Sequence, residues 1–435
     1  MAGSHRRGGG RRHGVLVALA VVALLDVGAL AGMGVLEARR AQRVSGAGAI
    51  HAPAPQPAEG TGPRVAHVEY GALFSQPGHQ VSSDVAWDDE WLFADPAAYN
   101  HGLARACAVL SAVANAQSAY YQQGSGSRAY MQEALGALGF RDVDSSSYRY
   151  RSEVVDEVSG VVDGSVDVVA YTIATKRVTS RETGAERYVV AVVVRGSYGS
   201  EWVSNANLAP APGESGEDHL GFSRAADEVA RAVERRVAQL PAGSEVAYLT
   251  CGHSRGGAVA NLLAARLPAG PSQPEGSAHP ATTYCYTFAA PACTTAERAG
   301  ASAHDNVFNV VNPSDLVPSL PLASWGYRRY GRDVVLPGAG TPGLDALWER
   351  FSAAYEASMG LPPTCDPSDR EVVASFSARA GRRVPTLEDA LTPAGVAQLA
   401  RSAVGMDVPR LLASHYPNTY IAWLEACGPQ DLTFS

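Results

Sequence analysis

The sequence predicts an α/β fold in which a mostly parallel sheet is covered by helices on both faces. Short apolar runs alternate with segments of helical periodicity along the chain. Each apolar run is unbroken, as expected of strands that are buried on both faces. The 435 residues are 46% hydrophobic, which is sufficient for a large core and excludes a wholly disordered chain.

The first half of the chain contributes helices and a hairpin. Apolar residues at helical spacing predict helices over Tyr99–Ala114 and Ala129–Leu138. Two apolar segments, Val166–Val178 and Arg187–Val194, flank a polar turn at Glu182–Gly184. Together they predict a β-hairpin.

The second half alternates helices with strands. A helix is predicted over Ser223–Leu240, because its apolar residues fall on one face. The short apolar strand Val246–Thr250 precedes a helix over Gly256–Leu267. Two further apolar strands are predicted at Thr283–Ala289 and Val307–Val311. This alternation is typical of a sheet with helical crossovers.

The N-terminus has the pattern of an export segment. Several arginines precede the apolar run Val15–Leu36, which only Asp26 interrupts. Residues 1–43 are therefore either a cleaved signal peptide, with a small-residue cleavage site at Ala29–Ala31, or an uncleaved membrane anchor. In both interpretations the rest of the chain lies outside the cytoplasm.

Beyond this segment the sequence predicts a linker and one domain. Residues 44–64 are rich in Pro, Ala and Gly and form the predicted linker, and residues 65–435 form the domain. The formal net charge is −8, with its acidic excess in the domain and no basic stripe, which argues against a nucleic-acid partner.

The cysteines indicate no metal site. Cys251 and Cys285 lie in apolar strands and are expected to be buried thiols. The other four leave three disulfide pairings open: Cys107, Cys293, Cys365 and Cys427. Because no Cys or His cluster has zinc spacing, we expect neither a metal nor another cofactor.

A nucleophile motif lies between a predicted strand and a predicted helix. Gly252-His253-Ser254-Arg255-Gly256 fits G-x-S-x-G, which alone occurs by chance in a chain this rich in Gly and Ser. Here it stands where a nucleophile elbow needs it, and the small residues around Ser254 suit so tight a turn. Ser254 is therefore the candidate nucleophile of an α/β-hydrolase-type fold.

A serine nucleophile needs a base and a carboxylate that orients the base. In this architecture the chain order is Ser, then Asp or Glu, then His. Asp315 follows the predicted strand Val307–Val311, at the end where open α/β sheets keep their chemistry. His415 is the only histidine after Asp315. The order therefore selects Ser254, Asp315 and His415, and His253 is interpreted as a supporting residue.

The developing oxyanion needs two N–H donors. One candidate is the backbone N–H of Arg255, directly after the nucleophile. The other is Ser197, in the glycine-containing loop after the strand Arg187–Val194.

Several motifs in order resemble the class 3, or fungal-type, lipase family of α/β-hydrolases. The resemblance covers about Val166 to Arg332 together with the His415 segment. It rests on Val194-Arg195-Gly196-Ser197, Trp202, His219-Leu220-Gly221-Phe222, Gly252-His253-Ser254-Arg255-Gly256-Gly257, Thr287-Phe288-Ala289-Ala290-Pro291 and Asn312-Pro313-Ser314-Asp315-Leu316-Val317-Pro318.

The resemblance implies triacylglycerol lipase or related acyl-ester hydrolase activity in lipid degradation. It implies Ser254, Asp315 and His415 as the triad and Ser197 as an oxyanion residue, and it places the start of a lid at Glu201-Trp202. Two features depart from the family pattern. Arg255 stands where the family usually has Leu, and the interval from Asp315 to His415 is longer than in the compact fungal enzymes.

Residues 337–410 are predicted to be a helical insertion before the C-terminal histidine. One apolar stripe within it has helical spacing: Leu344, Leu347, Trp348, Phe351, Tyr355 and Met359. Such a stripe is core more often than not, and the alternative is a mobile cap over an acyl pocket.

Three functional hypotheses remain open on the sequence. The leading one is an exported serine esterase or lipase that needs no cofactor and acts on a lipid or other acyl ester. The second is a phospholipase or thioesterase with the same triad, because the elbow does not encode the substrate. The third is a non-catalytic surface binding protein on the same fold. If the segment Val15–Leu36 is uncleaved, the membrane is a further partner.

Overall fold

A computed structural model describes residues 62–72, 79–123, 128–150, 169–196, 216–270, 272 and 278–435. The predicted export segment, almost all of the predicted linker, Ser197 and the proposed lid start at Glu201-Trp202 lie outside these ranges. None of the helices in the described ranges is both long and apolar enough to cross a membrane.

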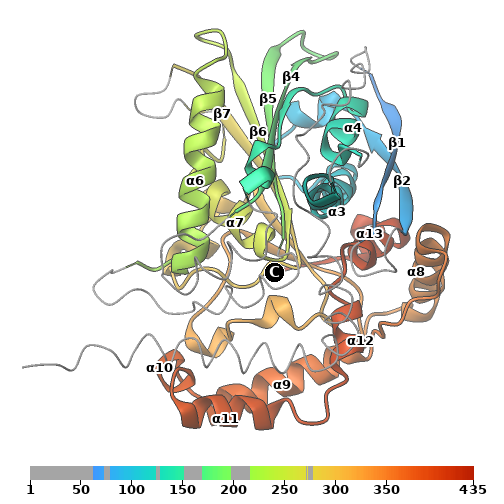
Figure 1. The fold of residues 1–435 in the computed structure, drawn as a ribbon, viewed down its shortest axis with the longest axis vertical. Coiled ribbons are helices and arrows are strands. Elements are labelled where there is room, and N and C mark those ends of the chain that lie inside the picture. The colour runs from blue at the N-terminus through green and yellow to red at the C-terminus, as the bar shows by residue number, and fades with distance from the viewer. Residues whose placement is uncertain are drawn as a thin grey trace, which may run out of the picture.

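The main sheet has eight strands in the described chain, in the order β10-β9-β8-β7-β6-β5-β4-β3 (Figure 1). Neighbours from β5 to β9 pair in parallel, and both edges of the sheet are antiparallel. The strands are β3 (Arg141–Asp144), β4 (Tyr171–Thr179), β5 (Glu186–Val194), β6 (Val246–His253), β7 (Ala281–Phe288), β8 (Val307–Val311), β9 (Arg332–Val335) and β10 (Thr433–Phe434). The mostly parallel α/β sheet is thus confirmed, and so is the predicted hairpin, as β4 and β5.

Helices cover both faces of this sheet because the central strands alternate their apolar side chains. On β5, Val189, Ala191 and Val193 join one core cluster and Val190, Val192 and Val194 the other. The first cluster packs under α3 (His101–Gln123), α4 (Tyr130–Ala137) and α13 (Pro417–Ala426), and the second under α6 (Leu220–Val237) and α7 (Arg255–Ala264). Each of these helices except α13 overlaps a helix that the periodicity predicts.

A second, two-stranded sheet was not predicted. The strands β1 (Arg64–Gly71) and β2 (Gln80–Trp87) pair antiparallel and bury alternate residues against α3 and α4. Their period of two, with Tyr70 and Trp87 on the buried side, is the signal that identifies them.

The only lysine of the chain joins this small sheet to the main one. Lys176 on β4 donates from Nζ to Asp89 Oδ1 at 2.5 Å and to the carbonyl of Leu138 at 2.8 Å. Asp89 also accepts from Trp87 Nε1 at 2.7 Å and from Arg64 at 3.2 Å. Burial lowers the pKa of Lys176, and the Asp89 carboxylate opposes that shift.

The six cysteines are all free and buried. The expectation for Cys251 and Cys285 is confirmed, and none of the three pairings considered for the other four cysteines is formed.

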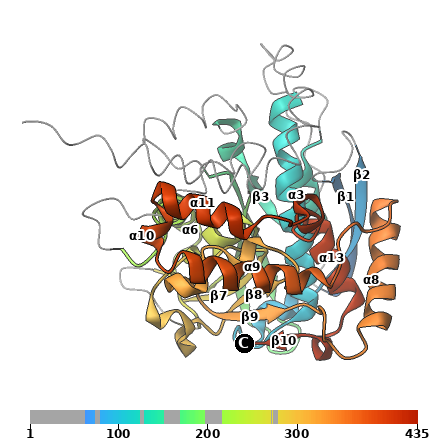
Figure 2. The ribbon, with the colours of Figure 1, turned by 90° about the horizontal axis from the view of Figure 1, so that it is seen from below.

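The predicted insertion divides into two parts. Its first helix, α8 (Leu344–Met359), packs on α13, and its remaining helices form a separate unit below the C-terminal ends of the parallel strands (Figures 1 and 2). That unit contains α9 (Asp369–Arg383), α10 (Leu387–Ala390), α11 (Pro393–Ser402) and α12 (Val408–Ala413). A third apolar cluster anchors it to Leu316 and Leu322, in the loop after β8.

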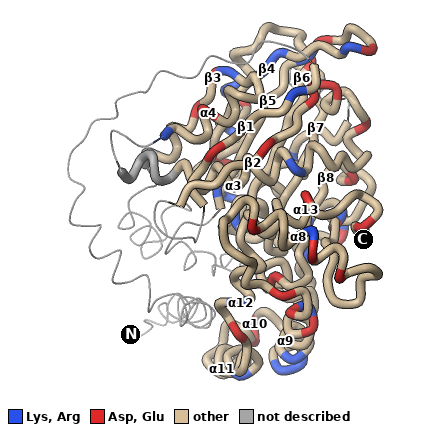
Figure 3. The backbone as a smooth tube through the Cα atoms, turned by 90° about the vertical axis from the view of Figure 1, so that its right-hand side faces the viewer, with Lys and Arg blue, Asp and Glu red and all other residues tan. Residues whose placement is uncertain are grey.

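Charges of both signs are mixed along the described chain (Figure 3). Helix α9 shows the pattern clearly, with Asp369 and Glu371 in its first turn and Arg382 and Arg383 in its last. This arrangement complements the helix dipole.

The apolar stripe of α8 belongs to the core. Leu347, Phe351, Tyr355 and Met359 are buried, and the Phe351 ring stacks on Trp423 of α13 with centroids 4.4 Å apart. These contacts favour the core interpretation of the stripe, because an aromatic partner on α13 covers the face that a cap would present to a lipid.

We expect Phe351→Ala to lower the free energy of unfolding by about 3–5 kcal/mol, because it leaves a cavity beside Trp423. Urea denaturation followed by tryptophan fluorescence measures this. The control is Leu361→Ala, at a residue 52% exposed just after α8, which should change stability by less than about 0.5 kcal/mol. A Phe351→Ala protein as stable as this control would contradict the core placement.

Candidate active site

The turn at Ser254 has the geometry of a nucleophile elbow. Ser254 stands between β6 and α7 with φ 58° and ψ −129°, a conformation that L-residues rarely adopt. Only glycine fits two residues before and two residues after it, since a Cβ on Gly252 would lie 2.4 Å from the carbonyl oxygen of Gly256, and one on Gly256 would lie 2.3 Å from that of Val194. Backbone contacts thus require the glycines at positions 252 and 256 of the predicted elbow.

The structure brings Ser254, His415 and Asp315 together across 161 and 100 residues of chain. His415 Nε2 lies 3.0 Å from Ser254 Oγ, and His415 Nδ1 lies 2.7 Å from Asp315 Oδ2. A carboxylate only accepts, so Nδ1 carries the proton and Nε2 is left to accept from the serine hydroxyl. All three residues are buried, with exposed fractions of 2–4%.

The Asp315 carboxylate is held by donors on both of its oxygens. Its Oδ1 accepts the backbone N–H of Val317 at 2.9 Å, and its Oδ2 accepts the hydroxyl of Tyr420 at 2.7 Å as well as the N–H of His415. Burial, with the Asp315 charge as a further cause, raises the pKa of Tyr420 well above its ordinary value, so the phenol stays protonated and donates.

Tyr420 was missed by the sequence reasoning. It lies on α13, five residues after His415, within a helix that the periodicity did not predict. Its position in the first half of a helix that directly follows the candidate base is the only signal that could have suggested it.

The loop after β5 runs beside the nucleophile. A Cβ on Gly196 would lie 2.8 Å from the carbonyl oxygen of His253 and 3.5 Å from Ser254 Cβ. Ser197, the next residue, lies outside the described ranges, so its side chain is not placed. Arg255 is the first residue of α7, directly after the nucleophile, and it is buried.

Two further histidines are buried near the elbow. Burial and the nearby charge of Arg255 lower the pKa of His219 to about 4. Burial first, and then the proximity of His415, lowers the pKa of His253 well below its ordinary value. Both imidazoles are therefore neutral at neutral pH, and the charge that develops during proton transfer is confined to His415.

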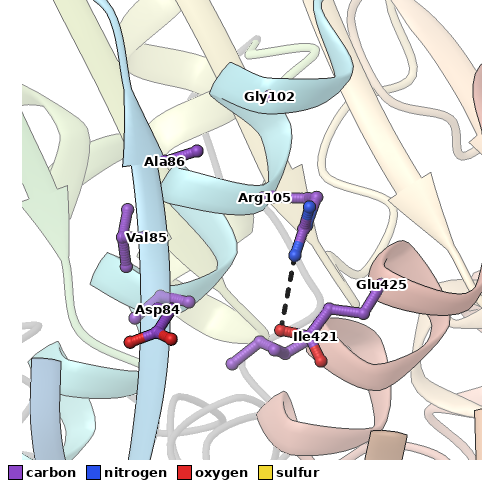
Figure 4. Close-up of a pocket in the computed structure, with 8 residues that line it drawn as sticks. Asp84, Val85, Ala86, Gly102, Arg105, Ile421 and Glu425 are labelled. Atoms are coloured by element: carbon purple, nitrogen blue, oxygen red, sulfur yellow. Dashed lines mark ion pairs between the residues drawn. The ribbon is translucent and has the colours of Figure 1, made fainter. Parts of the chain in front are cut away.

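The hollow in Figure 4 lies away from these groups, between β2, α3 and α13. The Arg105–Glu425 ion pair of 3.6 Å lies in it, and burial raises the pKa of Glu425. Its lining contains none of the three candidate catalytic residues: Asp84, Val85, Ala86, Gly102, Arg105, Val109, Ile421 and Glu425. Among the described residues, no group of three or more His, Cys, Asp or Glu side chains is arranged to hold a metal ion.

The model of the lipase (class 3) family matches residues 191–325, which include the end of β5, the elbow and the Asp315 loop. This segment of the chain therefore resembles the class 3 lipases. The match supports an ester hydrolase of the lipase type. No curated protein sequence matches the chain.

Among solved structures, the chain is similar to several lipases. A triacylglycerol lipase described as having a serine protease triad is 19% identical, with 54% of this chain and 78% of that chain covered and a TM-score of 0.35. The Rhizomucor miehei lipase propeptide complex is 18% identical, with 54% and 67% covered and a TM-score of 0.34. A mutant of MDLA from Penicillium cyclopium is 24% identical, with 56% and 84% covered and a TM-score of 0.33.

We expect Gly196→Ala to slow the reaction of this lipase with an ester, because the new methyl group displaces the loop that passes beside Ser254. Loss of one oxyanion donor costs on the order of 10²–10³ in kcat, which sets the expected scale. The measurement is p-nitrophenyl ester hydrolysis at saturating substrate. Gly300→Ala, where a Cβ meets nothing within 4 Å, is the control. Equal kcat in Gly196→Ala and Gly300→Ala would show that this loop does not contribute to the reaction.

Proposed function

We propose that this lipase cleaves carboxylic acyl esters of lipids through an acyl-enzyme on Ser254, with His415 as general base and Asp315 as its carboxylate partner. One observation carries the proposal. A continuous chain of hydrogen bonds runs from Ser254 Oγ through both nitrogens of His415 to Asp315, and from there to Tyr420. Burial makes these bonds stronger than they would be in water.

The acylation step follows from this geometry. His415 Nε2 takes the hydroxyl proton as Ser254 Oγ attacks the ester carbonyl carbon, and the carbonyl π electrons move to oxygen. Asp315, fixed by Val317 and Tyr420, steadies the imidazolium that forms. The N–H of Arg255 and the proposed donor Ser197 receive the oxyanion.

Collapse of the tetrahedral intermediate completes the cycle. The electrons return to the carbonyl, the bond to the alcohol oxygen breaks, and His415 gives its proton to that oxygen. Water then enters, loses a proton to His415 and attacks the acyl-enzyme. The same steps release the carboxylic acid and restore the Ser254 hydroxyl. His415 accepts and returns the proton in both halves of the cycle.

We also propose that the enzyme acts outside the cytoplasm, either secreted after signal cleavage or anchored by an uncleaved segment. The basis is the arginine-rich start followed by the apolar run Val15–Leu36.

Ser254→Ala and His415→Ala should each lower ester hydrolysis by at least about 10³-fold, because members of a triad act as a unit. Asp315→Asn should cost somewhat less. A fluorophosphonate probe should label the wild type and not Ser254→Ala.

His304→Ala is the matched control for the base. Its ring packs on Tyr330 with centroids 4.7 Å apart, and partial burial lowers its pKa. Hydrolysis that survives His415→Ala and is lost in His304→Ala would refute the assignment of the base. A wild-type protein that neither reacts with the probe nor hydrolyses any ester in a panel would indicate the binding-protein alternative.

Fractionation of the native host tests the location. We expect activity in the medium, the periplasm or the membrane fraction. N-terminal sequencing distinguishes the two modes, since a mature chain that begins near Gly32 indicates a signal peptide and a membrane-bound chain that retains residues 1–31 indicates an anchor. Activity confined to the cytosol would contradict export.

A further inference from the structure

Three consecutive carbonyls lie at the turn that carries His415, and each accepts a side-chain donor. Thr419 Oγ1 donates to the carbonyl of Ala413 at 2.7 Å. Asn312 Nδ2 donates to the carbonyl of Ser414 at 3.0 Å, and His253 Nε2 donates to the carbonyl of His415 at 2.7 Å. The last carbonyls of a helix find no N–H donor within that helix. At the end of α12, side chains from other segments supply the donors.

Two of these donors lie close in sequence to the other catalytic residues. His253 directly precedes Ser254, and Asn312 stands three residues before Asp315. Asn312 is itself fixed, because its Oδ1 accepts the N–H of Ser314 at 3.0 Å and its own N–H donates to Tyr420 Oη at 3.2 Å. The nucleophile loop and the acid loop are therefore each tied directly to the base loop.

We propose that His253 and Asn312 are positioning residues that fix the turn Ala413–His415, so that the His415 imidazole stays aligned between Asp315 and Ser254 while the proton moves. The inference rests on the proposed serine hydrolase function and adds two residues to its machinery. Neither residue touches the reacting atoms. Both act through the backbone of the base.

The chemistry of His253 suits this role. A carbonyl only accepts, so the bond to His415 requires a proton on His253 Nε2. The two imidazole rings lie 4.8 Å apart, and a second positive charge at that distance would oppose the imidazolium of His415. Burial keeps His253 neutral, which leaves it a donor without a competing charge. Among the described residues, Asp315 and His253 contact His415, and Tyr420 contacts both of them through its bond to Asp315 and its ring contact with His253.

Alignment at this level matters because the proton is transferred over a short distance. A misplacement of about 1 Å in a catalytic group can cost on the order of 10²-fold in rate. The direction of the His415 side chain follows from its backbone, and the carbonyl bonds to His253 and Asn312 fix the two peptide groups on either side of the His415 Cα.

The first pair of variants removes and restores the donor of His253. His253→Phe keeps a ring and loses the N–H, whereas His253→Gln places an amide N–H near the position of Nε2. The matched control is His279→Phe. His279 is also a buried histidine that donates to a backbone carbonyl, that of Ser244 at 3.0 Å, but it precedes β7 at the opposite end of the sheet.

The second pair concerns asparagine. Asn312→Ala removes the bond to Ser414, and Asn306→Ala is its control. Asn306 is equally buried and donates to the carbonyl of Thr283 at 2.9 Å, at the other end of β8.

Turnover is measured per active site, with sites counted by the end point of fluorophosphonate titration so that misfolded protein does not contribute. We expect kcat for a soluble p-nitrophenyl ester to fall about tenfold to 10²-fold in His253→Phe and Asn312→Ala, with KM unchanged. His253→Gln should recover most of that loss. The two controls should lose thermal stability and keep kcat per site.

A second readout needs no substrate. The proton shared by His415 Nδ1 and Asp315 gives a downfield NMR resonance, which should shift or broaden in His253→Phe and Asn312→Ala and stay unchanged in both controls. Wild-type kcat per site together with a wild-type resonance in these two variants would overturn the proposal, as would a His253→Gln protein no better than His253→Phe.

A failure of the proposed function would be seen in the wild-type protein itself and not in the variants. A wild-type protein that reacts with neither ester nor probe refutes the hydrolase mechanism, whatever the variants do. The resonance then still reports whether His253 and Asn312 align His415, since it depends on the hydrogen bond and not on turnover.

Discussion

The whole site depends on one steric constraint, the left-handed backbone of Ser254. Such a conformation costs on the order of 1–3 kcal/mol, and it persists because hydrogen bonds to neighbouring segments hold the backbone in place. The N–H of Ser254 donates to Phe288 on β7 at 2.8 Å, and its carbonyl accepts from Ala258 in the first turn of α7 at 3.1 Å. The serine side chain is thereby lifted out of the strand, toward the ends of the neighbouring strands.

That constraint determines which loops can contribute. Because β5, β6, β7 and β8 are parallel neighbours, the loop with Gly196 and the loop with Asp315 lie at the same strand ends as Ser254. The residue after β7, Ala289, also has a positive φ, of 53°, and its N–H donates to Val310 on β8. Two adjacent strand ends are therefore bent sharply where the chemistry lies, and α12 and α13 bring His415 to them from far along the chain.

The features of the fold and the site that could be predicted are those whose sequence pattern lies within a short segment. The parallel strands, the elbow and the order of Ser254, Asp315 and His415 are written in short segments, and the structure agrees with the fold and brings those three side chains together. Tyr420 and Asn312 act only through tertiary contacts over about a hundred residues of chain, which periodicity does not encode. The stripe of α8 could be interpreted as core or cap, because an apolar face does not say what covers it; Trp423 on a helix that the sequence did not predict covers it here.

The burial of Lys176 has a practical consequence for handling the protein. Because it is the only lysine in the sequence and its side chain is 6% exposed beside Asp89, the folded enzyme presents no accessible ε-ammonium group. Amine-directed cross-linkers, dyes and activated resins will find no lysine to couple to on the native surface. Reaction at Lys176 thus becomes a selective reporter of opening between the small sheet and the main one, readable by mass spectrometry at a single position.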